Sequence, residues 1–409
     1  MTRYYEKDAV CYGDLGGRLP PGAVPAAGPF DPLVLLVNRD PRTSRGIFAV
    51  SRPGEVFEPE GPSLLLPPPE GSVDPAADAV IAAHGACVVN TAFARCFDVL
   101  PAVLRPKTGG LRVTLAGLGD VGGTVATALV LLGRQVAEIG IYDFYEPLCR
   151  RYELELNQVL STEDGRTMPR VVIRRPEELF DCDVFLFTAS RGVPPVGSQV
   201  GDVRMAQLEA NRALLAPYAR QAREAGFTGL FCQISDPVDQ LARHAFLESN
   251  RDASGRWDGA GLLPEQVQGY GLGVMEARAR YFARKRGLDE AAVAVFGPHG
   301  QQLVAANDPG DGYDDGVSRA LTEDTVTANL AVRELGFKPY IAPGLSSAAI
   351  SVLATVSGRW HAGAVPMDGA YFGCRSRMTA RGLQLDRRPL HPQLFRRIAA
   401  AHRALRDGD

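Results

Sequence analysis

The stretch that decides the fold runs from Leu111 to Asp143 and reads LRVTLAGLGDVGGTVATALVLLGRQVAEIGIYD. It begins with an apolar run typical of a β-strand and continues with a Gly-x-Gly-x-x-Gly turn. An apolar helical pattern and a second strand follow the turn. These features in this order predict a β-α-β unit, in which two parallel strands are joined by a helical crossover.

The three glycines of the turn have separate roles in such a unit. Gly117 permits the tight turn, Gly119 lets a pyrophosphate approach the backbone, and Gly122 lets the helix pack closely on the strand. The phosphates would lie on the free N–H groups at the positive end of the helix. Asp143 ends the second strand, where a carboxylate accepts the ribose hydroxyls of NAD and repels the 2′-phosphate of NADP. The stretch therefore predicts an NAD site, with a glycine-rich turn of some other α/β unit as the alternative.

The composition is that of an ordinary globular protein. The 409 residues have room for two or three domains, and 45% of them are hydrophobic while 22% are charged. A net charge of −3 gives no electrostatic reason to expect binding to nucleic acid or to an anionic membrane. The seven cysteines are scattered and lack Cys-x-x-Cys spacing, which favours reduced thiols over disulfides or a zinc site. With no signal peptide and no long apolar run, we expect a cytoplasmic protein without a bound metal.

The pattern of the chain predicts three parts. Residues 1–110 are rich in proline, and two apolar runs, Pro32–Asn38 and Gly46–Ser51, predict a β-hairpin in a small β-rich extension. Such an extension covers a surface or an oligomer contact, or else it acts as a lid or specificity element. Residues 111–240 alternate strand and helix, which predicts a Rossmann-type doubly wound parallel sheet. Residues 241–409 predict an α+β substrate domain.

Seven motifs in order resemble the lactate/malate dehydrogenase family across residues 111–409. The first is GLGDVGG (117–123) with the aspartate that ends the second strand. The others are FTASRG (187–192), DVRMAQLEAN (202–211), SDPVD (235–239), GVMEARARYF (273–282), GPHGQQ (297–302) and PGLSSAAI (343–350). The resemblance implies an NAD-dependent oxidoreductase that moves a hydride between nicotinamide and a small, atypical 2-oxo or 2-hydroxy acid. It also implies a homo-oligomer, either a dimer or a tetramer. The residues it assigns to the cofactor are Gly117, Gly119, Asp120, Val121, Gly122, Asp143, Thr188, Ala189 and Asn211.

The proposed chemistry needs three protein functions besides the cofactor site. His299, in a Gly-Pro-His-Gly turn after a strand, is the candidate acid/base, because histidine titrates near neutral pH. Arg278 is the candidate clamp, since a guanidinium binds a carboxylate through two parallel hydrogen bonds. Arg204 follows a Gly/Pro-rich loop and is expected to polarise the substrate carbonyl as that loop closes. By resemblance, Ser346 lines the substrate site.

Two positions depart from the family pattern. Met275 occupies the place of the aspartate that orients the catalytic histidine in the family, with Glu276 beside it. Asp236 replaces the asparagine of the family's SNPVD motif, and a carboxylate accepts where an amide both donates and accepts. Either Asp236 or Glu276 partners His299, or the substrate has changed, or catalysis is lost. Position 276 lies about 100° round the helix from position 275, so Asp236 is the better substitute.

Two rival functions remain open at this stage. One is the same hydride chemistry on an imine or an amino acid, with Asp236 recognising a substrate cation. The other is a non-catalytic NAD-binding protein, against which the retention of Arg204, Arg278 and His299 together argues.

Overall fold

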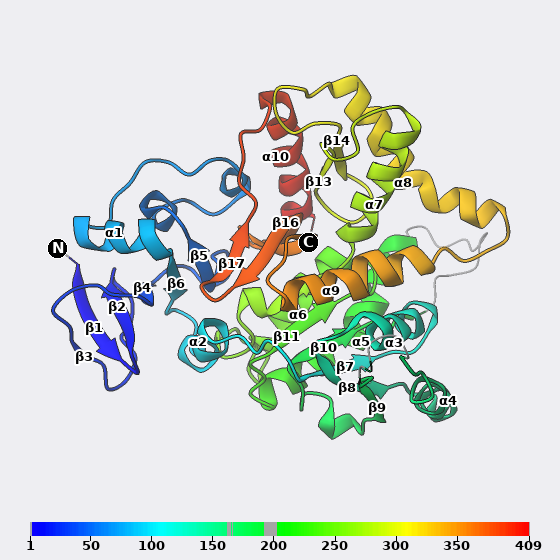
Figure 1. The fold of residues 1–409 in the computed structure, drawn as a ribbon, viewed down its shortest axis with the longest axis horizontal. Helices are drawn as coiled ribbons and strands as arrows, with labels where there is room; N and C mark the ends of the chain where they lie inside the picture. Colours follow the sequence, from blue (N-terminus) through cyan, green and yellow to red (C-terminus); the bar gives the residue numbers. More distant parts are fainter. Residues whose placement is uncertain (1, 162–164, 166, 192–202, 409) are drawn as a thin grey trace.

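The computed structural model describes residues 2–161, 165, 167–191 and 203–408, with the backbone alone for residues 203–206. Most strands of this part of the chain form one mixed sheet that runs through the whole molecule (Figure 1). Its order is β3-β1-β2-β4-β6-β5-β17-β16-β15-β12-β11-β10-β7-β8-β9, and β13 pairs with β14 separately. The sheet therefore joins an N-terminal unit, a C-terminal antiparallel unit and a parallel half.

The parallel half has the doubly wound order expected from the sequence. Its strands run β9-β8-β7-β10-β11-β12, and each pairs in parallel with its neighbours. The sixth strand, β12, lies beyond residue 240, where this unit was expected to end. The strands are β7 (Leu111–Ala116), β8 (Val136–Tyr142), β9 (Arg170–Ile173), β10 (Val184–Phe187), β11 (Leu230–Gln233) and β12 (Val267–Gly269).

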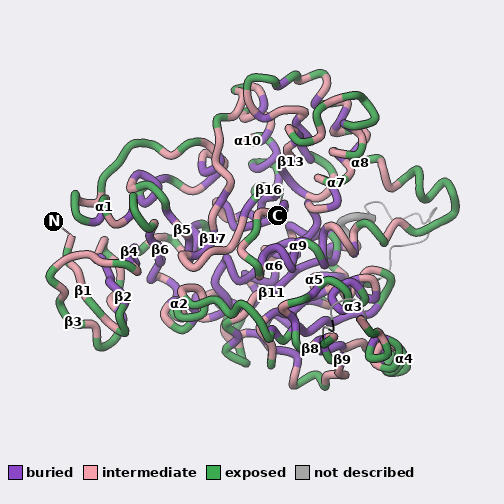
Figure 2. The backbone as a smooth tube through the Cα atoms, in the orientation of Figure 1, coloured by how far each residue is buried: buried purple, intermediate pink, exposed green. Residues whose placement is uncertain are grey.

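Helices cover both faces of this half, because side chains alternate between the faces along each strand. In β10, Phe185 and Phe187 join one buried core, while Val184 and Leu186 join another. The first core takes in α5 and α6, and the second takes in α3 and α9. Figure 2 shows the buried residues concentrated along the strands, whereas α4 is largely exposed. The helices are α3 (Asp120–Leu132), α4 (Glu146–Leu156), α5 (Val203–Glu224) and α6 (Val238–Ser249).

The C-terminal unit extends the sheet with antiparallel strands. β15 pairs with β12, and β16 and β17 follow in order. A terminal helix packs Leu394 and Ile398 against this extension. The strands are β13 (Ala294–Phe296), β14 (Val304–Ala306), β15 (His361–Met367), β16 (Ala370–Thr379) and β17 (Gly382–Leu385). The helical segments are η4 (Pro264–Gln266), α7 (Leu272–Lys285), α8 (Asp315–Glu334), η5 (Pro343–Ala349), α9 (Ile350–Val356) and α10 (Pro392–Asp407).

The N-terminal unit is rich in β-structure, as predicted. It continues the sheet through parallel pairing of β5 with β17, at Phe48 and Leu383. Its strands are β1 (Arg3–Lys7), β2 (Val10–Asp14), β3 (Val24–Pro25), β4 (Leu33–Val37), β5 (Ile47–Val50) and β6 (Ala86–Asn90). Its helical segments are η1 (Pro53–Val56), η2 (Pro62–Leu65), α1 (Pro75–His84) and α2 (Cys96–Leu104).

The predicted β-hairpin in this unit is wrong. Both apolar runs form strands, β4 and β5, but they do not pair with each other. β6 lies between them, parallel to β4 and antiparallel to β5. The cause is the fully buried run Ala86–Asn90, which needs a strand partner on each side. Helix α1 therefore ends at His84, and Gly85 turns the chain with a φ of 72°.

A buried carboxylate connects the N-terminal unit to the rest of the molecule. Glu265 in η4 is 3% exposed and accepts hydrogen bonds from the backbone N–H groups of Gly46 (2.8 Å) and Ile47 (3.0 Å). Burial raises the pKa of Glu265 from 4.5 to about 7, although these amides act in the opposite direction. The folded chain therefore holds a proton on Glu265 more tightly than the unfolded chain does.

We predict that this carboxylate makes the protein less stable as the pH rises. Because the pKa is raised in the folded state, the effect starts near 4.5 and is complete above about 7. The difference corresponds to about 3 kcal/mol. Urea unfolding of the wild type should show this loss between about pH 5 and pH 8.5, and Glu265→Gln should remove that part of the slope. An identical pH dependence in the variant would contradict the prediction.

Candidate active site

The glycine turn after β7 has the geometry that a dinucleotide site requires. Gly117 has a φ of 102°, and a Cβ there would overlap the amide nitrogen of Ala189. A Cβ on Gly122 would overlap the carbonyl oxygen of Gly117, so helix α3 approaches the strand as closely as backbone allows. A Cβ on Gly119 would meet no atom within 4 Å. The described residues leave the space over Gly119 open, and none of their side chains caps this end of α3.

Asp143 lies beside the turn, at the end of β8. Its Oδ2 accepts the backbone N–H of Leu118 at 2.7 Å, and its Oδ1 accepts that of Tyr145 at 3.0 Å. These two bonds hold the carboxylate in place and leave further lone pairs, because a carboxylate has about four acceptor sites. Asp143 is therefore held at the position where the sequence analysis placed a ribose-binding acid.

The other cofactor candidates of the first two motifs also surround the turn. Thr188 donates its hydroxyl hydrogen to the carbonyl oxygen of Gly117 at 2.6 Å, which ties the end of β10 to the turn. Val121 is partly buried against the core beneath α3. Asp120, in the first turn of α3, turns its carboxylate to the ammonium of Lys338 at 2.9 Å. This pairing offsets a negative charge that would otherwise oppose a phosphate there.

Asn211 of α5 connects the ends of β10 and β11. It is fully buried; its amide nitrogen donates to the carbonyl oxygen of Asp236 at 2.7 Å, and its Oδ1 accepts the N–H of Arg191 at 2.9 Å. Both ends of the amide are thus engaged with protein groups. The geometry gives Asn211 a positioning role for the segments around the site, rather than a free group for direct contact.

The loop after β13 brings His299 to the end of β11. Its Nε2 lies 3.6 Å from Oδ1 of Asp236. The ring packs against Gly271, where a Cβ would lie 2.7 Å from its Cγ. Its Nδ1 is buried and has no hydrogen-bond partner in the part of the chain that the structure describes. Asp236 is thus near the imidazole, but near the nitrogen opposite the one that lacks a partner.

On α7, Met275 and Glu276 each contact an arginine of the same helix. The guanidinium of Arg278 donates to the sulfur of Met275 at 3.6 Å. Burial lowers the pKa of Arg278, while the nearby charge of Asp236 raises it. Within the described ranges no carboxylate lies within ion-pair distance of Arg278, so the group is available to an anionic ligand. Glu276 instead binds Arg280 at 2.6 Å on the same helix and is directed away from His299.

Two serines lie where η5 meets α7. Ser347 donates to the carbonyl oxygen of Gly271 at 2.6 Å and accepts the N–H of Val274 at 2.8 Å. It therefore holds the start of α7, which carries Arg278, and the sequence analysis did not find it. Ser346 is partly buried, and its carbonyl oxygen accepts the hydroxyl of Ser351 at 2.8 Å. The side chain of Arg204 lies outside the described residues, although its backbone begins α5.

Asp239 is the other residue that the sequence analysis missed. It is 5% exposed, and its Oδ2 accepts the backbone N–H of His299 at 2.8 Å. Burial raises the pKa of Asp239 to about 6, against the lowering effect of this hydrogen bond. Its place at the end of the SDPVD motif, in the first turn of α6, was the available signal. Asp236 and Asp239 thus contact the same histidine, one at the ring and one at the backbone.

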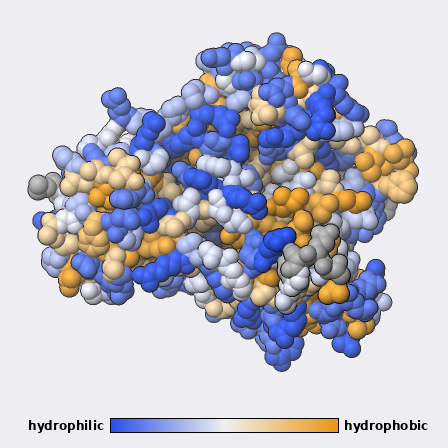
Figure 3. Space-filling model, viewed as in Figure 1, coloured by the Kyte–Doolittle hydropathy of each residue, from blue (hydrophilic) through white to orange (hydrophobic). Residues whose placement is uncertain are grey.

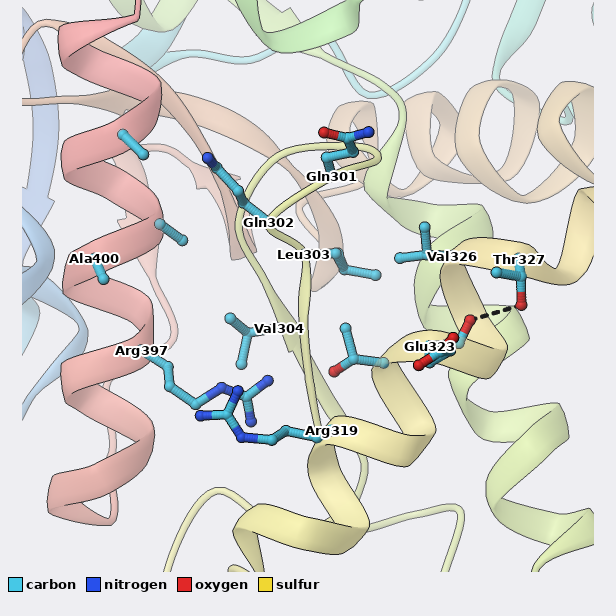
Figure 4. Close-up of a pocket in the computed structure, with 13 residues that line it drawn as sticks. Gln301, Gln302, Leu303, Val304, Arg319, Glu323, Val326, Thr327, Arg397 and Ala400 are labelled. Carbon is cyan, nitrogen blue, oxygen red and sulfur yellow. Dashed lines mark hydrogen bonds between the residues drawn. The ribbon is translucent and has the colours of Figure 1, made fainter.

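One cavity among the described residues is separate from these groups. It measures about 860 Å³ and lies between α8, α10 and the segment that follows the His299 turn (Figure 4). Of the arginines that line it, Arg319 is paired with Asp315 at 2.7 Å, and Arg397 lies 3.4 Å from the same carboxylate. The hydroxyl of Thr327 donates to the backbone of Glu323, shown by a dashed line. The two arginines thus have a carboxylate partner within the protein, and we assign the cavity no chemistry.

Further features of the described residues narrow the choice of site. They bring together no group of three or more His, Cys, Asp or Glu side chains suited to a metal ion. None of their helices is long and apolar enough to cross a lipid bilayer. All seven cysteines are free, and only Cys182 is not fully buried. The glycine turn and the His299 cluster therefore remain as the candidate active site.

Comparison with known proteins agrees with this geometry. No family model matches the chain. Over 200 residues it is 30% identical to an L-lactate dehydrogenase of Treponema denticola, covering 48% of this chain and 56% of that protein. Over 202 residues it is 27% identical to L-lactate dehydrogenase 2 of Staphylococcus aureus, covering 49% of this chain and 57% of that protein. The chain is thus similar to L-lactate dehydrogenases over about half of its length. The resemblance seen in its motifs is thereby confirmed.

Solved structures of lactate/malate dehydrogenases share the fold. A minor L-lactate dehydrogenase of Enterococcus mundtii gives a TM-score of 0.60 at 19% identity, covering 74% of this chain and 99% of that one. A malate dehydrogenase of Archaeoglobus fulgidus, in complex with NADH, gives a TM-score of 0.60 at 17% identity. The match covers 73% of this chain and 98% of that one. The predicted Rossmann-type fold is confirmed. Each neighbour leaves about a quarter of this chain unmatched, which is about the length of residues 1–110. The chain also spans little more than half the length of the curated relatives it matches.

We predict that Asp239 fixes the His299 turn. Asp239→Ala leaves a buried N–H without an acceptor, which costs about 1–3 kcal/mol. Hydrogen exchange in the peptide containing His299 should therefore become about tenfold to a hundredfold faster. Asp239→Asn keeps an accepting oxygen and should change the rate much less. Unchanged exchange in the alanine variant would show that other contacts hold the turn.

Proposed function

We propose that the protein is an NAD-dependent oxidoreductase of lactate/malate dehydrogenase type, acting on an atypical small 2-oxo or 2-hydroxy acid. The observation that carries the proposal is the meeting of His299, Arg278 and Asp236 at one edge of the parallel sheet. The same edge carries the glycine turn, which Thr188 ties to the end of β10. An acid/base, a carboxylate clamp and a dinucleotide turn are the groups that this reaction needs from the protein.

The residues around the turn suit NAD. Gly119 leaves open space for a pyrophosphate at the start of α3, whose backbone N–H groups would bind it. Asp143 would accept the hydroxyls of the ribose. When bound, NAD supplies a nicotinamide ring that accepts a hydride or returns it.

The chain's own groups would carry out the rest of the reaction. Arg278, which has no carboxylate partner among the described residues, binds the carboxylate of the substrate as a planar clamp. His299 exchanges the hydroxyl proton at Nε2, and the positive charge formed on the ring is stabilised by Asp236 at 3.6 Å. Arg204 would polarise the carbonyl and Ser346 would line the pocket, as their positions in the motifs suggest.

The first prediction of this proposal concerns the cofactor. We expect NADH to bind at least about tenfold more tightly than NADPH, because Asp143 repels a 2′-phosphate. Fluorescence titration of the purified protein with each cofactor measures this ratio. Asp143→Ser should weaken NADH binding and reduce the preference. Equal affinity of the wild type for both cofactors would exclude the role assigned to Asp143.

A second candidate substrate is an imine or an amino acid. The observation that favours it is Asp236, which has a side chain 58% exposed beside His299, where the family has an amide. With Arg278 it places one anion and one cation around the same space, which matches a carboxylate and an ammonium on one small molecule. The hydride would still leave the carbon next to the carboxylate, while the proton would leave nitrogen instead of oxygen.

The two substrate classes can be separated by one set of assays. We expect nicotinamide absorbance to change with a member of a panel of 2-oxo acids, 2-hydroxy acids and 2-amino acids, the oxo acids being tested with and without ammonium. His299→Ala should abolish turnover while NADH binding is kept, and Arg278→Lys should raise KM by about tenfold or more. Arg280→Lys, on the same helix but paired with Glu276, is the matched control.

Asp236→Asn decides between the classes. For a 2-hydroxy acid, loss of the carboxylate should lower kcat, because the positive charge formed on His299 loses its stabilising partner. For an amino acid, the main effect should be a rise in KM. NADH binding without turnover on the whole panel would instead favour a non-catalytic NAD-binding protein.

We also expect the protein to self-associate as a dimer or tetramer, as its motifs imply. Hydrophobic side chains gather over the segment that follows α8, at the right of Figure 3, where Leu335, Phe337 and Ile341 are more than half exposed. An apolar patch of this kind is typical of an interaction surface. A cytoplasmic location remains a prediction from the sequence.

A further inference from the structure

A second cavity lies at the opposite edge of the parallel sheet. It measures about 750 Å³, and its floor includes Leu111, Val184 and Leu230, the first residues of β7, β10 and β11. The glycine turn and His299 lie at the other ends of these strands. The cavity is therefore separate from the proposed active site. Its volume is within the range of about 300–1,000 Å³ that pockets for small molecules occupy.

The N-terminal unit supplies one wall of this cavity. Val99, Ala102 and Val103 of α2 line it, together with Ile47 of β5. The opposite wall comes from the C-terminal antiparallel strands and includes Met378. In Figure 1, α2 lies between the N-terminal strands and the parallel half. The cavity thus depends on residues of the N-terminal unit.

The charged groups that line the cavity differ in whether they are paired. Lys107 binds Asp183 at 2.8 Å near the surface. Glu265 is bonded to the backbone N–H groups of β5 and the residue before it, and so does not offer a free carboxylate. Arg377, in contrast, has no carboxylate within ion-pair distance among the residues described. Among the described residues that line the cavity, it is the basic side chain without a carboxylate partner.

Arg377 is also held in a fixed orientation. Its Nε donates to Oε1 of Gln384 at 2.8 Å, and its guanidinium lies over the ring of Trp360, 4.5 Å from the centroid. A stacked and hydrogen-bonded guanidinium loses little freedom when it binds an anion. Apolar side chains from α2 and from the first residues of the parallel strands line the same cavity.

We propose that this cavity binds a small amphipathic carboxylate, with its anionic group on Arg377 and its apolar body against α2 and the start of the parallel strands. The ligand would contact the N-terminal unit and the rest of the molecule at once. Its binding would therefore stabilise their junction, since a ligand stabilises the state to which it binds. This site has no part in the proposed oxidoreductase chemistry.

Calorimetric titration of the full-length protein with laurate tests the proposal, with dodecanol as the uncharged probe. We expect saturable binding of laurate and a raised Tm. Ala102→Trp, which adds bulk at an exposed helical position facing the cavity, should abolish binding of both probes. Arg377→Gln should weaken laurate by about tenfold or more and dodecanol much less, because a charged hydrogen bond is lost.

Two controls make the result decisive. Arg375→Gln removes the same charge from the same strand at an exposed position that does not line the cavity, and it should leave laurate binding unchanged. Arg377→Lys keeps the charge and should retain part of the affinity if Arg377→Gln folds poorly. NADH binding should be normal in every variant, so failure here is distinguishable from failure of the oxidoreductase proposal. Absence of saturable binding, or binding that persists in Ala102→Trp, would show that the cavity is not the binding site. Equal weakening of both probes in Arg377→Gln would show that Arg377 does not bind the carboxylate of the ligand.

Discussion

The proposed active site depends on the parallel pairing of β7 with β8 and β10, and of β10 with β11. Parallel strands all end at the same edge, so residues that follow each strand meet there although they are far apart in sequence. Gly117, Asp143, Thr188 and Asp236 follow four such strands. Contacts at this edge then hold their side chains in place, such as the hydrogen bond from Thr188 to Gly117. If one strand were reversed, its functional residue would move to the opposite edge.

Much of this arrangement could be predicted because each element has a strong local pattern. The glycine turn, the helix after it and the apolar strands determine the parallel half without reference to distant residues. The error in the N-terminal unit has the opposite origin. Two apolar runs and a polar connection fit a hairpin, and only the later run Ala86–Asn90 shows that a third strand separates them. Pairing between distant strands is a tertiary property that the local pattern does not contain.

The site shows the same division between local and distant information. The helical period favoured Asp236 over Glu276 as the partner of His299, and Glu276 is paired with Arg280 instead. The role of Asp239 could not be obtained in this way, because it rests on a contact between α6 and the turn after β13. Likewise, sequence placed Asp236 near the histidine but could not say which ring nitrogen it approaches.

Among the described residues, Nδ1 of His299 has no hydrogen-bond partner, because Met275 stands where the family pattern has an aspartate. An aspartate behind the ring would stabilise a charged imidazole from the protein side. Here the sulfur of Met275 is engaged by Arg278, and the nearest carboxylate is on the Nε2 side. Leaving a buried polar atom without a partner costs about 1–3 kcal/mol, so the arrangement is maintained against a preference for pairing. The carboxylate of Asp236 therefore lies on the Nε2 side of the ring, where the proposed substrate would bind.

The pairing of β5 with β17 also bears on the solubility of the chain. A C-terminal sheet that ended at β17 would expose a row of unpaired backbone groups, a template for strands of other molecules. With the N-terminal unit in place, that boundary of the sheet passes to β3, which spans only Val24–Pro25. A two-residue strand containing a proline offers few N–H groups for further pairing. Residues 1–110 thus replace a long unpaired edge strand by a short one. The short edge disfavours pairing with strands of other molecules and the aggregation that follows from such pairing.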